Sequence, residues 1–136
     1  MAQLYLKVVT PEKLLIDEEV SQVNVSTEQG QLGILPHHAN LMAKLQPGEL
    51  VIKRDGKEDS MAIGDGFLQI VDNTLTVMTD LASFEKDIDE KAVEEAKKRA
   101  EQALEQTLSS EEYAETLANL EKSLAQLRIK RRHRVR

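Results

Sequence analysis

Residues 87–136 have the sequence DIDEKAVEEAKKRAEQALEQTLSSEEYAETLANLEKSLAQLRIKRRHRVR, without glycine or proline, and all glycines and prolines of the chain lie before them. Such a composition favours helices, because both residues disrupt them. Asp87 stands three residues before Glu90, and Ser109 stands three residues before Glu112. This spacing is the capping box with which many helices begin. Two helix starts in one stretch predict an antiparallel hairpin.

The apolar residues of the two predicted helices differ in size. The first helix has mostly small side chains at spacings of three and four: Ala92, Val93, Ala96, Ala100, Ala103 and Leu104. The second has larger ones: Tyr113, Leu117, Leu120, Leu124 and Leu127. We therefore expect leucines to face alanines. Because a buried leucine contributes about 1.5–3 kcal/mol and an alanine much less, the hairpin is expected to be modestly stable and able to separate and repack.

The first 85 residues have a different pattern. Leu4, Leu6 and Val8 alternate with polar residues, which is typical of a half-buried strand. Turn signals at Pro11, Pro47-Gly48, Asp55-Gly56 and Asp72-Asn73 separate further short apolar runs. Short strands at intervals of about 8–12 residues predict a small antiparallel β-sandwich or barrel. We expect two domains, a sandwich over residues 1–85 and a helical hairpin over residues 86–136.

The net charge of −6 conceals a strong asymmetry. All 24 acidic residues precede residue 128, so residues 1–127 carry −12, whereas residues 128–136 carry +6. A basic helix end is often solvated and interacts favourably with the helix dipole. It is equally suited to contact an acidic surface on another chain. Both interpretations remain open at this point.

Composition narrows the possible functions. The chain has no cysteine or tryptophan and only two phenylalanines and two tyrosines, which leaves little material for stacking on nucleic-acid bases. No apolar run exceeds three residues, and the first residues lack a signal-peptide pattern. Any association with a membrane is therefore expected to occur through a partner.

The pattern of reactive residues favours a binding or coupling protein over an enzyme. His37 and His38 are adjacent and would point to opposite faces of a strand, and His133 lies in the basic tail. The glycines in residues 30–33 and 64–66 lack the lysine and hydroxyl residue of a phosphate loop. Asp87, Asp89 and Glu90 are explained by helix capping.

Five segments, taken in order, resemble the epsilon subunits of bacterial F-type ATP synthases, called delta in mitochondria. They are Val8-Val9-Thr10-Pro11, Gly30-Gln31-Leu32-Gly33-Ile34-Leu35-Pro36-His37-His38-Ala39, Gly66-Phe67 with Leu75-Thr76-Val77-Met78-Thr79-Asp80, Ile88-Asp89-Glu90 with Lys97-Lys98-Arg99-Ala100-Glu101, and Ala125-Gln126-Leu127-Arg128. The resemblance covers nearly the whole chain. It implies a β-sandwich of about ten short strands followed by an antiparallel helical hairpin, in agreement with the pattern of residues.

The resemblance also implies a role without catalysis. Members of this family clamp the gamma subunit at the foot of the central stalk, rest on the ring of c subunits, and couple ring rotation to the catalytic head. Their helices fold against the sandwich or extend along gamma toward the alpha/beta hexamer, where they hold back ATP hydrolysis. No cofactor is implied. The expected location is the cytoplasmic face of the bacterial cell membrane, reached only through the complex.

Individual residues follow from the same resemblance. Gln31 and His38 are candidate contacts to the c ring. The candidate contacts to the beta subunits are Lys122, Arg128, Lys130, Arg131, Arg132 and Arg134. Some relatives bind ATP on the folded hairpin, and Asp89 and Arg99 match that site. Because Ala92 and Val93 stand where Arg-Ala is expected, we expect weak or no ATP binding.

Two other functions fit less well. A nucleic-acid adaptor would use residues 128–136 as a phosphate contact, but the acidic balance and the scarcity of aromatics oppose it. A small hydrolase would need a nucleophile with a base, a carboxylate pair or a metal cluster, and the sequence indicates none.

Overall fold

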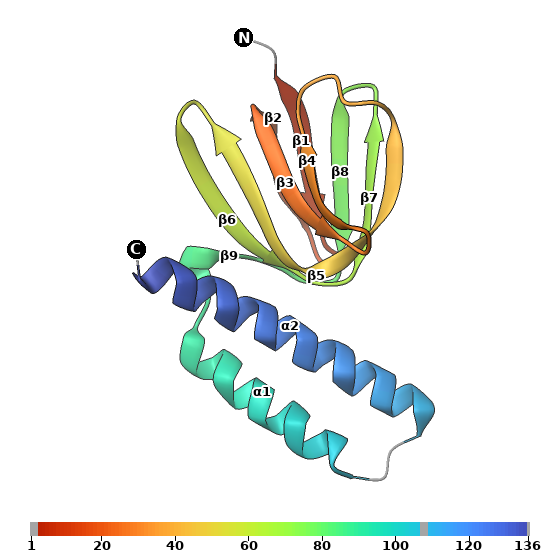
Figure 1. The fold of residues 1–136 in the computed structure, drawn as a ribbon, viewed down its shortest axis with the longest axis vertical. Helices are drawn as coiled ribbons and strands as arrows, with labels where there is room; N and C mark the ends of the chain where they lie inside the picture. The colour runs from red at the N-terminus through yellow and green to blue at the C-terminus, as the bar shows by residue number, and fades with distance from the viewer. Residues whose placement is uncertain (1–2, 107–108, 136) are drawn as a thin grey trace.

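The computed structural model describes residues 3–106 and 109–135, together with the side chains up to residue 132. Within these residues the strands are β1 (Leu4–Val9), β2 (Leu14–Val20), β3 (Gln22–Thr27), β4 (Gly30–Ile34), β5 (Leu41–Arg54), β6 (Lys57–Ile63), β7 (Gly66–Val71), β8 (Thr74–Thr79) and β9 (Ala82–Phe84). A short 3-10 turn, η1 (Glu85–Asp87), leads to the helices α1 (Glu90–Leu104) and α2 (Ser110–Val135). The predicted β-sandwich followed by a helical hairpin is confirmed (Figure 1).

The strands form two layers that share β5. One layer has the order β2–β1–β8–β7 and continues into the first half of β5, and the other contains β4, β3, the second half of β5, β6 and β9. Among the described strands, the pairing of β1 with β8 is parallel and the other pairings are antiparallel. The parallel pair arises because β8 returns beside the first strand of the chain.

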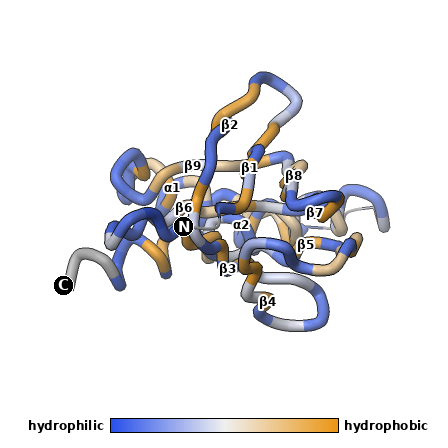
Figure 2. The backbone as a smooth tube through the Cα atoms, turned by 90° about the horizontal axis from the view of Figure 1, so that it is seen from above, coloured by the Kyte–Doolittle hydropathy of each residue, from blue (hydrophilic) through white to orange (hydrophobic). Residues whose placement is uncertain are grey.

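Aliphatic side chains fill the space between the layers. In β1 the alternation of Leu4, Leu6 and Val8 places three fully buried residues on one face, as the sequence predicts. Other fully buried residues come from both layers: Val23, Val25, Leu50, Ile52, Leu68, Ile70, Leu75 and Val77. Figure 2 shows hydrophobic and hydrophilic residues interspersed along the backbone of the strands. The hydrophobic core of the sandwich is therefore formed by the strands themselves.

The turn predicted at Pro47-Gly48 is wrong, because β5 passes through both residues without reversing. Residues 41–44 pair with β7 in one layer, and residues 48–54 pair with β6 in the other. Pro47, which has no N–H to donate, lies where the strand changes layers. A Cβ on Gly48 would lie 2.7 Å from the Ser26 hydroxyl oxygen and 3.1 Å from the Ser26 Cβ, so a side chain at this position would crowd β3.

The helix starts are confirmed, with one correction. Ser109 accepts a hydrogen bond from the backbone N–H of Glu112 at 3.1 Å, as its capping box predicts. For α1 the capping residue is Asp89, which accepts from the N–H of Ala92 at 3.2 Å. Asp87 does not cap α1, because it belongs to η1.

Helix α2 lies between α1 and one end of the sandwich (Figure 1). With α2 in this position, the prediction that its leucines pack against the alanines of α1 needs correction. Ala100 and Leu127 are buried, but Tyr113, Leu117 and Leu124 remain 48%, 36% and 38% exposed. Helix α2 buries Ser123, Ala125 and Ile129 in addition, because it contacts β5, β6 and η1 as well as α1. In the described residues, neither helix has a segment sufficiently long and apolar to cross a bilayer.

Candidate functional site

The predicted basic surface of α2 is largely engaged within the chain. Lys122 forms an ion pair with Asp80, and its side chain is only 19% exposed. The Lys130 ammonium lies 3.6 Å from a carboxylate oxygen of Glu85 and donates to the Glu85 carbonyl oxygen at 3.3 Å. These two cations therefore face the segment that joins the sandwich to the hairpin.

The next two cations contact different parts of the molecule. Arg131 donates to Glu90 at 3.1 Å and also pairs with Glu94, so it joins α2 to α1. The hydrogen bond to Glu90 is the main reason that the pKa of Arg131 is raised above its usual value. Arg132 pairs with Glu49 of β5, and the Glu49 side chain is 15% exposed.

The remaining cations do not share these contacts. Arg128 is exposed and lines a pocket between α2 and the sandwich, together with Gln31. The side chain of Arg134 lies outside the described part of the chain. Lys122, Lys130 and Arg131 contact residues that lie 37 to 45 positions earlier in the chain, namely Asp80, Glu85, Glu90 and Glu94. No local sequence motif predicts contacts over such separations. In the sequence, the only indication of acidic partners within the chain is the net charge of −12 over residues 1–127.

The two candidate c-ring contacts lie at opposite ends of β4. Gln31 is the second residue of the strand, next to the β3–β4 turn, and its amide donates to Ser26 at 2.8 Å. His38 lies in the loop after the strand, where its backbone N–H donates to the Leu35 carbonyl at 3.2 Å. The structure therefore does not bring Gln31 and His38 together in one cluster.

The loop that contains His38 is held by the β7–β8 turn. Asn73 accepts from the N–H of His37 at 2.7 Å and donates to the Gln3 carbonyl at 2.7 Å. In the same turn, the N–H of Asp72 donates to Asn40 at 3.1 Å. Asp72 and Asn73 have φ angles of 47° and 63°, a conformation that suits Asn, Asp and Gly in tight hairpins. This turn thus fixes the loop before any partner binds.

Replacing Asn73 with glycine is expected to lower the free energy of unfolding by about 1–2 kcal/mol. Glycine tolerates the positive φ, but two hydrogen bonds are lost, each contributing roughly 0.5–1.5 kcal/mol. Urea denaturation followed by circular dichroism measures the change. The matched control is Asp72→Gly, which keeps the N–H that donates to Asn40. Equal stability of the Asn73→Gly variant and the unmodified chain would contradict the proposed role of these bonds.

The predicted nucleotide residues do not form a pocket in the described structure. Asp89 is engaged as the cap of α1, whereas Arg99 is an exposed residue of the same helix. Ten residues separate them, about 15 Å along a helix. The expectation of weak or no ATP binding remains a prediction.

The structure adds an apolar surface that the sequence did not indicate. Phe67 of β7 lies opposite Met78 of β8, and Met78 lies opposite Val9 of β1. Phe67 and Met78 are 51% and 39% exposed. With Pro11 beside them, these residues line a shallow, mainly apolar hollow on the outer face of the sandwich, which we call the outer apolar patch. The cross-strand register creates it, and register cannot be seen in local sequence.

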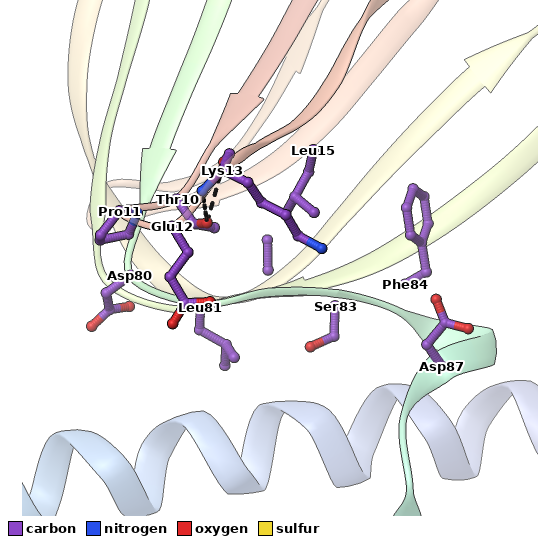
Figure 3. Close-up of a pocket in the computed structure, with 11 residues that line it drawn as sticks. Thr10, Pro11, Glu12, Lys13, Leu15, Asp80, Leu81, Ser83, Phe84 and Asp87 are labelled. Carbon is purple, nitrogen blue, oxygen red and sulfur yellow. Dashed lines mark hydrogen bonds between the residues drawn. The ribbon is translucent and has the colours of Figure 1, made fainter.

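A separate pocket of about 430 Å³ lies between the β1–β2 turn and β9 (Figure 3). Its lining includes Lys13, Leu15, Phe84 and the carboxylates of Asp80 and Asp87. Asp80 is engaged with Lys122, and among the described residues no three acidic, histidine or cysteine side chains are placed to hold a metal ion. The pocket does not bring together groups that would make a reaction centre.

Comparison with known proteins assigns the fold to one family. The β-sandwich domain of the ATP synthase delta/epsilon chain matches residues 3–85, and the long α-helix domain of the same chain matches residues 86–131. The ATP synthase epsilon chain of Herpetosiphon aurantiacus is 35% identical over 133 residues, covering 98% of each chain. That of Nitratidesulfovibrio vulgaris is 35% identical over 127 residues, covering 93% of this chain and 95% of its own length.

Solved structures have the same fold. A chain in the mitochondrial ATP synthase of Euglena gracilis, solved with OSCP, F1 and the c-ring, aligns with a TM-score of 0.77 at 23% identity, covering 100% of this chain and 83% of that one. A chain in the central stalk and c-ring of Tetrahymena thermophila ATP synthase aligns with a TM-score of 0.60 at 18% identity, covering 95% and 94%. The protein belongs to the delta/epsilon chain family of ATP synthases, as the sequence resemblance indicates.

Proposed function

We propose that this chain is a non-catalytic rotor subunit of the central stalk of an F-type ATP synthase. The relationship to epsilon chains over 98% of its length carries the proposal. The chain would couple rotation of the c ring to the catalytic head through gamma. It would act at the cytoplasmic face of the bacterial membrane, which it reaches only through the complex.

We propose that gamma binds at the outer apolar patch. A permanent partner requires an interface whose centre is apolar, and Phe67 and Met78 provide such a centre on a face that α1 and α2 do not cover. We assign the c ring to the more polar surface around β4, where Gln31 and His38 were predicted. These assignments place the contacts with gamma and with the c ring on separate surfaces of the sandwich.

The hairpin is assigned a regulatory role. We propose that residues 86–136 form a unit that can leave the sandwich over residues 1–85 and inhibit ATP hydrolysis by contact with the beta subunits. The small apolar contact between α2 and the sandwich supports this, because the cluster around Ile129 contains few buried residues. An element with two positions requires packings that differ by only a few kcal/mol.

Removal of residues 88–136 tests the regulatory role. The shortened chain is expected to keep its sandwich, because the core between the two layers contains no helical residue. It should assemble with gamma and the c ring, and ATP hydrolysis by the reconstituted complex should increase several-fold. Hydrolysis is compared with that of the same complex containing the full chain. An unchanged rate, with normal assembly, would contradict inhibition and leave a purely coupling role.

A further inference from the structure

A pocket of about 320 Å³ lies between α2 and the sandwich, beside the β3–β4 turn and the middle of β5. Its helical wall contains Arg128 and Arg132, which are four residues apart and therefore lie in one row along α2. Ala125 and Ile129 belong to the same wall and are only 2% and 3% exposed, so this part of the helix is closely packed. The two arginines thus line the pocket from a well-ordered support.

The opposite wall of the pocket carries neutral hydrogen-bond donors. Gln31 donates one amide hydrogen to the Ser26 hydroxyl oxygen at 2.8 Å, which leaves its second amide hydrogen for another acceptor. Ser26 accepts in this bond, and among the described residues its own hydroxyl hydrogen has no acceptor. Thr27 differs, because its hydroxyl donates to the Gly30 carbonyl oxygen at 2.8 Å. The sandwich wall therefore offers two unused donors, one from Ser26 and one from Gln31.

The side chains that line the pocket carry a net positive charge. Within the described part of the chain, Arg128 makes no hydrogen bond or ion pair, so its five N–H donors are unused. Arg132 pairs with Glu49, the one acidic residue among the described residues of this lining. The two charges of that pair cancel, and the charge of Arg128 remains. An unpaired guanidinium beside neutral donors favours a negatively charged ligand.

We propose that the pocket between α2 and the sandwich binds a phosphate group. Oxygens of a phosphate point in several directions and can accept from both walls at once, whereas the two oxygens of a carboxylate are satisfied by a single guanidinium fork. The pocket contains neither Asp89 nor Arg99, so it is separate from the nucleotide residues considered above. It uses groups of this chain alone and is therefore independent of the proposed rotor function. The residues that bind the phosphate are Arg128, Arg132, Ser26 and Gln31.

Titration of the isolated full chain with inorganic phosphate tests the site. Backbone and arginine side-chain signals are followed by heteronuclear NMR, and sodium chloride keeps the ionic strength constant. Signals of residues 26–31 and 125–132 should shift and saturate together, because one ligand contacts both walls. Acetate is expected to bind at least several-fold more weakly. Shifts that do not saturate, or that sodium chloride alone reproduces, would overturn the proposal.

Replacing Arg128 with glutamine is expected to weaken phosphate binding about tenfold, because the unpaired charge and its charge-assisted hydrogen bonds are lost. The side chain is exposed, so the variant should remain folded. The matched control is Arg99→Gln, which removes the same charge from an exposed residue of α1 outside the pocket. Equal weakening in both variants would show that phosphate responds only to the overall charge of the chain, and the proposed site would be wrong.

Two further variants test the geometry of the site while keeping its charge. Arg128→Lys keeps the cation but loses the planar fork, so its affinity should lie between those of the unmodified chain and Arg128→Gln. Ser26→Ala removes a hydroxyl donor from the opposite wall and is expected to weaken binding several-fold. Unchanged affinity in Ser26→Ala would contradict a ligand held between the helix and the sandwich.

A parallel titration with glycerol phosphate distinguishes two sources of the phosphate group. This compound carries the group on a larger molecule, as a phospholipid headgroup does. Binding as tight as that of inorganic phosphate, or tighter, supports a phosphorylated molecule as the ligand. Binding of inorganic phosphate alone supports the free ion. Absence of saturable binding with both compounds would overturn the proposal, whether or not the chain assembles with gamma.

Discussion

An alanine at position 66 is expected to unfold the sandwich or leave it only marginally stable. Gly66 begins β7 with a φ of +151°, and it pairs with Thr79 of β8. A Cβ there would lie 1.9 Å from the carbonyl oxygen of Met78 and 2.9 Å from Cα of Thr79, and both atoms belong to the backbone. Because backbone atoms cannot rotate away, β7 and β8 must separate at this point. The expected loss is about 3–5 kcal/mol.

Gly56→Ala is the matched control for this substitution. Gly56 also has a positive φ, +79°, but a Cβ there would meet no heavy atom within 4 Å. Only the conformational strain remains, which costs about 1 kcal/mol. Both variants are compared with the unmodified chain by urea denaturation followed by circular dichroism. Similar losses in the two variants would contradict a decisive steric clash at Gly66.

The strands of the sandwich illustrate what local sequence determines. Leu4, Leu6 and Val8 are predicted by alternation alone, because each strand must turn one face to the core. The sequence predicts a turn at Pro47-Gly48, but in the structure β5 crosses there from one layer to the other. The same two residues suit both a turn and such a crossing. The choice depends on the partners of β5 on either side, which are distant in sequence. Cross-strand partners also create the outer apolar patch, so the patch could not be predicted.

In the helices, too, local sequence predicts some features, whereas others depend on contacts between distant residues. The capping box at Ser109 identifies the start of α2, because a cap involves only neighbouring residues. Which side chains α2 buries depends on a second contact, with the sandwich, and the leucine pattern therefore does not give the correct face. The cations of α2 were recognised from composition and family resemblance. Their acidic partners within the chain become visible only when the fold brings residues 80–94 and Glu49 beside the helix.

A charged residue at position 67 is expected to detach the chain from gamma while leaving its fold intact. The Phe67 side chain is 51% exposed at the centre of the outer apolar patch, so Phe67→Asp removes little buried area from the isolated protein. In the complex, the same position would bury an unpaired carboxylate, which is costly. A central aromatic anchor in an interface contributes about 2–4 kcal/mol, so affinity for gamma should fall roughly 30- to 900-fold.

Leu35→Asp provides the control, since Leu35 is similarly exposed at 56% but lies in the loop after β4, outside the patch. Affinity is measured by binding of purified gamma to each immobilised variant, and urea denaturation verifies that both variants are folded. Phe67→Asp should lose binding and Leu35→Asp should retain it. If Phe67→Asp bound gamma normally, the attachment would have to lie on another face of the sandwich, and the assignment of the apolar patch would be wrong. If both lost binding equally, the interface would extend to the loop that carries His38, and the separation between gamma and c-ring surfaces would fail.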